Sequence, residues 1–255
     1  MKNIYTISKY TFIEVFRSKI VIGLGVLALF LMLICYVASE FAYGAPSKVA
    51  LDFGLGIMSL SNMIIAIFIG STLLSKEIEN RNLYMILSRP ISRTSFLLGK
   101  ILGLSAILVT NAILLTIVTV IMFVYYGGVL NSIILWATYF TLLESFILIG
   151  FSVLFSLVTN VNMSVFYSLI ILTLGYGLND SLKGFVARTN LGLSKLLSVA
   201  SFFIPNFEKL NLKDFVIYKQ EIGLDYLISS NLYVVLYLAA LFVIISLIFE
   251  NKNLD

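Results

Sequence analysis

Long apolar blocks separated by short polar segments dominate the chain. A transmembrane helix needs about 20 mostly apolar residues, and this pattern predicts six of them. The fifth block is short and carries two glycines near its end, so this span is expected to be irregular or broken there. The predicted spans are Ile20–Ala38, Phe53–Ser75, Ile101–Tyr126, Ile133–Val158, Met163–Leu178 and Leu227–Phe249.

The N-terminal segment, residues 1–19, has an amphipathic pattern that predicts an interfacial elbow helix leading into the first span. Lys9 and Arg17 lie elsewhere on the helical wheel. A frayed basic tail is the alternative, but such tails rarely carry so many aromatic and β-branched residues. The residues that share one side of this helix are Ile4, Ile7, Phe12, Val15 and Phe16.

The longest segment predicted outside the membrane, residues 179–226, precedes the last span. Leu191–Ile204 is largely apolar. As a helix it would reach only about 21 Å, which is too short to span a membrane and indicates an interfacial or re-entrant helix. Pro205–Asp225 mixes charged and aromatic residues and is expected to fold as a small external cap.

Composition supports a single all-α membrane domain over residues 1–255. Hydrophobic residues make up 60% of the chain and charged residues 12%, whereas a soluble domain carries about 25% charged residues. The chain has no histidine and one cysteine, which excludes histidine-dependent catalysis, disulfides and zinc–thiolate sites. The methionines are scattered, so no metal site is expected, and the net charge of +4 is attributed to membrane orientation, not to nucleic-acid binding.

The distribution of Lys and Arg predicts a multi-pass protein of the cytoplasmic (inner) membrane with both termini in the cytoplasm. The long external segment weakens this contrast, because it carries six Lys and Arg residues alongside five acidic residues. The cytoplasmic positions under this orientation are Lys2, Lys9, Arg17, Lys19, Lys76, Arg81, Arg89, Arg93, Lys100 and Lys252.

Glu144 is the most informative polar residue within the predicted spans, since it lies near the middle of the fourth. A carboxylate at that depth costs at least about 2.5–3.5 kcal/mol on insertion scales, so it is expected to face protein or water. Residue counting places Asn111 and Asn62 at similar depth. The three side chains could line a substrate path, or they could hydrogen-bond between helices as packing contacts.

The polar insert at 76–98 lies between the second and third spans on the predicted cytoplasmic face. Glu77 and Glu79 predict a helix N-terminus, Pro90 ends that helix, and Ser92 or Ser95 caps the next. A helix of this kind suits docking of a soluble partner. An ordinary loop whose arginines follow the positive-inside rule is the alternative.

The run KEIENRNLYMILSRPISRTSFLLGKILG, residues 76–103, resembles the signature of ABC type-2 transporter permeases. The resemblance is strongest to the branch with the permeases of nitrous-oxide-reductase maturation and of gliding motility. Arg81 and Asn82 stand where many relatives have a small residue and Thr. The architecture also agrees: an elbow helix, six spans, an insert between spans two and three, and a long external segment. The matching positions are Glu77, Glu79, Leu87, Ser88, Arg89, Pro90, Ser92, Arg93, Leu98, Gly99, Lys100 and Gly103.

The resemblance implies a half-transporter. Two permeases, as a homodimer or with a close paralogue, would each dock one copy of an ABC ATPase subunit, and a periplasmic accessory protein could join them. The insert would couple to the ATPase through Glu77, Glu79, Arg81, Arg89, Pro90 and Arg93. No cofactor is expected on the permease itself, since ATP and Mg²⁺ would bind the ATPase.

The expected function is therefore ATP-driven export of a substrate that the sequence does not identify. The sequence has no G-x-x-x-x-G-K-[ST] phosphate-binding loop, because its single Gly-Lys pair, Gly99–Lys100, lacks that context. One alternative is a mechanotransmitter that acts on a periplasmic or surface protein without moving a substrate. The other alternative is an integral membrane enzyme. The lack of histidine and of any carboxylate pair at helical spacing argues against it.

Overall fold

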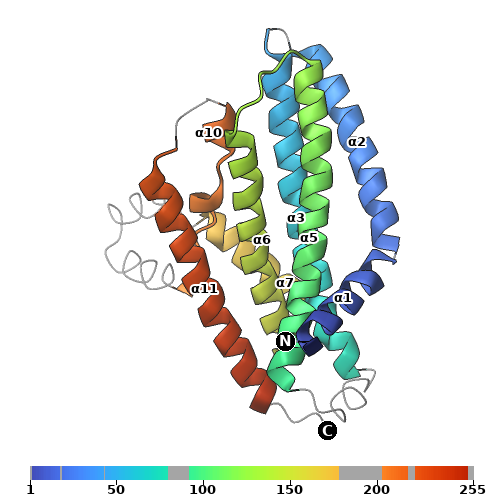
Figure 1. Cartoon of the computed structure of the whole chain (residues 1–255), viewed down its shortest axis with the longest axis vertical. Coiled ribbons are helices and arrows are strands. Elements are labelled where there is room, and N and C mark those ends of the chain that lie inside the picture. The colour runs from blue at the N-terminus through green and yellow to red at the C-terminus, as the bar shows by residue number, and fades with distance from the viewer. Residues whose placement is uncertain are drawn as a thin grey trace.

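A computed structural model describes residues 2–17, 19–42, 44–79, 92–177, 203–217 and 222–251. The regular elements within these ranges are all helices (Figure 1). They are α1 (Lys2–Phe16), α2 (Lys19–Phe41), α3 (Pro46–Glu79), α5 (Arg93–Tyr125), α6 (Ile133–Val158), α7 (Val161–Gly177), the 3-10 turn η1 (Glu208–Leu210), α10 (Lys213–Ile217) and α11 (Leu224–Asn251).

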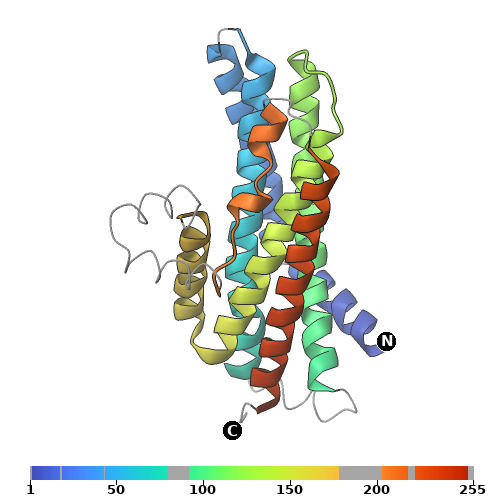
Figure 2. The same ribbon diagram turned by 90° about the vertical axis from the view of Figure 1, so that its left-hand side faces the viewer.

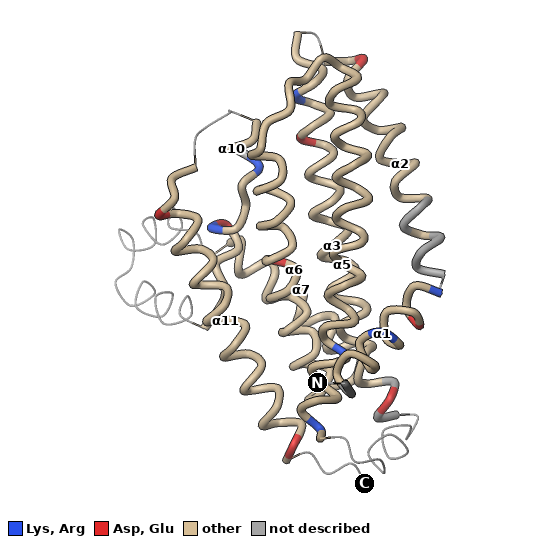
Figure 3. The backbone as a smooth tube through the Cα atoms, in the orientation of Figure 1, with Lys and Arg blue, Asp and Glu red and all other residues tan. Residues whose placement is uncertain are grey.

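The three long helices α3, α5 and α6 form the centre of the bundle and pack against one another. Figure 1 shows α2 on one side of them and α11 on the other, while α7 packs on α6 and α3. Charged residues gather mostly toward the two ends of the bundle (Figure 3). We call the end where α3 finishes, α5 begins and α11 finishes the insert end.

Four of these helices are long and apolar enough to cross a membrane, and two further apolar helices are shorter. The bounds of α6 coincide with the predicted fourth span, whereas α3, α5 and α11 extend beyond the predicted apolar blocks by several residues. The four long spans are Pro46–Ser75, Arg93–Tyr125, Ile133–Val158 and Leu224–Asn251, and the shorter helices are Val26–Phe41 and Val161–Gly177.

Both ends of the 76–98 insert prove to be continuations of membrane helices. The prediction that a helix begins at Glu77 is wrong, because α3 continues through Glu79 without a break. The predicted cap is confirmed: the Ser92 hydroxyl accepts a hydrogen bond from the Ser95 amide (3.3 Å) and α5 begins at Arg93. The predicted proline turn lies outside the described residues.

Helix α1 packs directly on the start of α5 instead of lying only in the interface. An added Cβ at Gly99 would lie 2.7 Å from Cβ of Ile7, and one at Gly103 would lie 2.8 Å from the carbonyl oxygen of Ser8. Thr11 of α1, whose Cβ would lie 2.7 Å from the same added Cβ at Gly103, is 2% exposed. The two glycines of the L-G-K-x-x-G motif are therefore the surface that lets α1 approach α5.

Helix α7 is short for a membrane span over the residues that the structure describes, which end at Gly177. Its 17 residues rise about 25 Å, less than the roughly 30 Å of a bilayer core. The segment 203–217 lies beside the end of α7, where the amide of Phe207 donates to the carbonyl oxygen of Gly175 (3.4 Å). From there it rises to the end of α3 opposite the insert, where Val216 shares a small hollow with Leu51 (Figure 2).

The sequence predicted an external cap at Pro205–Asp225, of which the structure describes 205–217 and 222–225. Phe207, Leu210, Leu212 and Val216 are all buried against the bundle. The described part of this segment is therefore packed into the bundle. The apolar piece predicted at Leu191–Ile204 lies outside the described residues except for its last two positions.

Three tyrosines of the N-terminal half of α11 bind the irregular backbone of this segment. The Tyr237 hydroxyl donates to the carbonyl oxygen of Phe203 (2.6 Å), and the Tyr226 hydroxyl donates to that of Lys209 (2.5 Å). The Tyr233 hydroxyl accepts from the amide of Asn206 (3.0 Å). Because lipid offers no hydrogen bonds, these contacts allow non-helical backbone to lie beside the spans.

We predict that Gly103→Ala lowers the thermal midpoint of the purified permease in detergent. The added methyl group would press on the backbone of α1, and overpacking of this kind costs about 1–3 kcal/mol. Gly56→Ala is the matched control, since a Cβ there meets nothing within 4 Å. An equal midpoint for both variants would show that α1 does not need close contact with α5.

Candidate functional site

A cavity of about 600 Å³ lies beside the end of α7. Helix α3 contributes Ser59, Leu60 and Met63, and the end of α7 contributes Leu172, Thr173, Tyr176 and Gly177. The segment 203–217 closes another side with Asn211 and Lys213. The cavity therefore lies where α3, the end of α7 and the segment 203–217 meet.

Glu144 lies directly behind this cavity, with Tyr176 between them. The Tyr176 hydroxyl donates a 2.5 Å hydrogen bond to Oε1 of Glu144, and Ser59 lies beside the same hydroxyl. Glu144 is 2% exposed, so the predicted orientation toward the protein interior is confirmed. Lys213 is near enough to attract the carboxylate electrostatically, although no ion pair joins them.

The predicted partners of Glu144 form a separate pair. Nδ2 of Asn111 donates to Oδ1 of Asn62 (2.7 Å) and also contacts the Ser61 hydroxyl (2.9 Å). Both asparagines are fully buried between α3 and α5. The hydrogen bond that the structure shows for Glu144 is to Tyr176, and the expected proximity of Glu144 to Asn111 or Asn62 stays a prediction.

Sequence reasoning missed Tyr176 and Lys213, which the structure brings to Glu144. Tyr176 stands between Gly175 and Gly177 at the end of the fifth apolar block, and this position was the available signal. A polar side chain at the break of a span tends to line the opening. Lys213 carried no such signal, because its position depends on how the segment 203–217 folds back.

A second polar cluster ties three helices together near the insert end. The Lys100 ammonium of α5 forms an ion pair with Glu77 of α3 and lies 3.8 Å from Glu14 of α1. Lys100 is 8% exposed. Burial raises the pKa of Glu77, while the neighbouring Lys100 charge acts in the opposite direction. The lysine of the L-G-K motif is thus a buried connection between helices.

Arg93 has a defined place at the same end. Its guanidinium donates to the carbonyl oxygens of Phe249 and Glu250, both at 3.0 Å, in the last turn of α11. A cation there satisfies carbonyl groups that have no partner within the helix. Arg93 therefore fixes the beginning of α5 to the end of α11.

The remaining predicted coupling residues are not placed. Arg81, Arg89 and Pro90 lie outside the described residues, and the side chain of Glu79 does too. In the parts of the chain that are described, no three His, Cys, Asp or Glu side chains gather where they could hold a metal ion.

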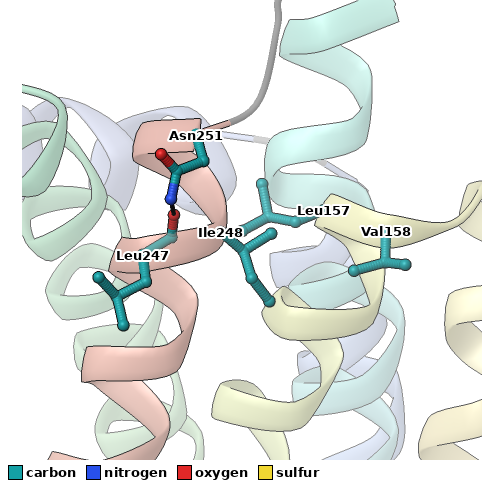
Figure 4. A pocket seen from close by; sticks show the side chains of 5 residues that line it. All are labelled: Leu157, Val158, Leu247, Ile248 and Asn251. Carbon is teal, nitrogen blue, oxygen red and sulfur yellow. Dashed lines mark hydrogen bonds between the residues drawn. The ribbon is translucent and has the colours of Figure 1, made fainter.

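A further hollow of about 490 Å³ separates α6 from α11 at the insert end (Figure 4). Leu157 and Val158 line it from one helix, and Leu247, Ile248 and Asn251 from the other. The side-chain amide of Asn251 donates to the carbonyl oxygen of Leu247 in the same helix (3.0 Å). This hollow has few polar side chains, so the cavity at the end of α7 is the better candidate site.

The model of a family described as "ABC-2 family transporter protein" matches residues 5–254, which is nearly the whole chain. No curated protein matches the chain.

We predict that Lys100→Met lowers the free energy of unfolding by about 3–5 kcal/mol, because it leaves the buried Glu77 carboxylate without its partner. Glu14→Gln is the control: Glu14 is 74% exposed as a side chain, and exposed pairs contribute about 0–1 kcal/mol. Denaturation of the detergent-purified variants measures both. Similar values for the two would mean that the Glu77 carboxylate does not depend on Lys100.

We also predict different effects of two substitutions at Glu144. Glu144→Leu leaves the Tyr176 hydroxyl without an acceptor and should cost about 1–3 kcal/mol, whereas Glu144→Gln keeps an acceptor oxygen and should change stability little. Tyr176→Phe should resemble the first variant in its thermal midpoint. An unchanged midpoint in Glu144→Leu contradicts the structural role, and loss of activity in a stable Glu144→Gln would assign a functional one.

Proposed function

The chain belongs to the ABC-2 transporter family, and from this membership we propose that it is the membrane permease subunit of an ABC transporter. The permease couples ATP hydrolysis on separate ATPase subunits to export of a substrate across the cytoplasmic membrane. The insert between α3 and α5 faces the cytoplasm and receives the ATPase.

The observation that carries this proposal is that both ends of the insert are bound to other helices. Glu77, near the start of the insert, pairs with Lys100, and Arg93, near its end, binds the end of α11. Close packing at Gly99 adds α1 to the same assembly. A displacement of the insert would therefore move α1, α3, α5 and α11 together.

The proposed topology has six spans, with α7 and the segment 203–217 together forming the fifth. Both termini lie in the cytoplasm. The described part of 203–217 is packed into the bundle, with Phe207 fully buried, and does not project toward an external partner. This favours transport over mechanical action on a periplasmic protein.

The working unit in this proposal is a pair of permeases with two ATPase subunits. Many large apolar side chains on the outer faces of α2 and α11, such as Leu29 (64% exposed) and Leu232 (58%), are open to lipid or to a second copy. ATP and Mg²⁺ bind on the ATPase, and a periplasmic accessory protein could complete the assembly.

Arg89→Glu tests the docking. We predict that this charge reversal in the insert reduces co-purification of the co-expressed ATPase by about tenfold or more, the effect of losing an interface hot spot. Lys9→Glu is the control, because Lys9 is exposed on α1 and the variant makes the same change in charge. Both proteins should appear in the membrane at equal levels.

Full co-purification and unchanged ATPase stimulation by Arg89→Glu would refute docking at the insert. The mass of the unmodified complex provides a second check, since it should correspond to two permeases and two ATPases. A single permease copy in the assembled complex would contradict the proposed pair.

A further inference from the structure

The cavity at the end of α7 has the size of a ligand site and a lining of both apolar and polar residues. Its volume of about 600 Å³ falls within the roughly 300–1,000 Å³ of small-molecule pockets. Leu60, Met63 and Leu172 provide an apolar side. The polar groups among the described lining residues are Ser59, Thr173, Tyr176, Asn211 and Lys213.

The charge of the described lining is positive. Lys213 is its charged residue, and among the described residues no carboxylate lies within ion-pair distance of its ammonium. Glu144 does not line the cavity, because Tyr176 covers it and donates to its carboxylate. An ammonium group beside apolar surface, with hydroxyl and amide groups near it, is suited to a phosphate or carboxylate group.

The cavity is open toward the side of the bundle. Leu60 is 59% exposed, and Thr173 and Gly177 at the end of α7 are exposed as well. These residues lie on helices that run through the apolar layer of the protein. A molecule could therefore enter from the surrounding lipid without passing through the packed centre of α3, α5 and α6.

We propose that this cavity binds a membrane-resident amphiphile with an anionic head group, the head on Lys213 and the apolar chain along Leu60 and Leu172. The inference rests on the proposed function insofar as it names the substrate class of the transporter. A small soluble anion would leave the apolar lining unused, and a neutral lipid would leave the Lys213 ammonium without an ion-pair partner among the described residues. The two halves of the lining together favour an anionic amphiphile.

Photo-crosslinking of the purified full-length permease in neutral detergent, without ATPase, tests the proposal. The probe is phosphatidic acid with a diazirine on its acyl chain, and the matched probe is the phosphatidylcholine with the same chain. We expect stronger labelling by phosphatidic acid, with crosslinks on peptides that contain Leu60 or Leu172. Lys213→Gln should reduce this labelling about fivefold, which corresponds to the roughly 1 kcal/mol of one lysine near an anionic lipid.

Two variants serve as comparisons. Lys209→Gln removes an exposed charge four residues away in the same segment and should label like the unmodified protein. Thr173→Trp places a bulky ring in the cavity from an exposed position, so the protein should still fold, and it should abolish labelling by either probe. The thermal midpoint of each variant confirms that it is folded.

Equal labelling of Lys213→Gln and the unmodified protein would overturn the proposal, as would equal labelling by the two probes. Full competition by glycerol phosphate would also overturn it, because the site would then bind a soluble anion. The outcome is separable from ATPase docking: the crosslinking uses the permease alone, whereas loss of docking in Arg89→Glu leaves the cavity unchanged.

Discussion

A membrane interior offers no hydrogen bonds, so every polar group there must find its partner inside the protein. The packing of the central helices follows from this constraint. Side chains of α3 meet those of neighbouring helices through short polar contacts, as between Ser71 and Ser164 (3.1 Å) or Asn62 and Asn111 (2.7 Å). Small polar residues of this kind let helices approach closely and also hold them. The apolar surface is then left for the outside of the bundle.

The same constraint applies to the irregular backbone of residues 204–212, which lies against the bundle. Other elements must satisfy its polar groups. Tyr226, Tyr233 and Tyr237 of α11 do so from one side, and the amide of Phe207 bonds to Gly175 of α7. The cavity beside Tyr176 lies where the end of α7 meets this segment.

Hydrophobic pattern was sufficient to locate the long helices and to predict burial of Glu144, Asn111 and Asn62. The bounds of α6, the Ser92 cap and the inward orientation of Glu144 all depend on local sequence or on depth. Residue counting fixes depth, however, and not rotation about the helix axis. The pairing of Glu144 with Tyr176, and of Lys100 with Glu77 and Glu14, depends on that rotation. The path of 203–217 was unpredictable because its partners are far away in the sequence.

Helix α3 links the two polar sites. Glu77 lies in the ionic cluster at the insert end and Ser59 lines the cavity, and the 18 residues between them correspond to about 27 Å of helix. Helix α3 continues unbroken from Ser59 to Glu77. In the proposed transporter, a shift imposed on Glu77 by the insert would therefore be transmitted along α3 toward the cavity. Since α7 and 203–217 are separate pieces held by hydrogen bonds, they can yield to that shift, and the cavity would change shape there first.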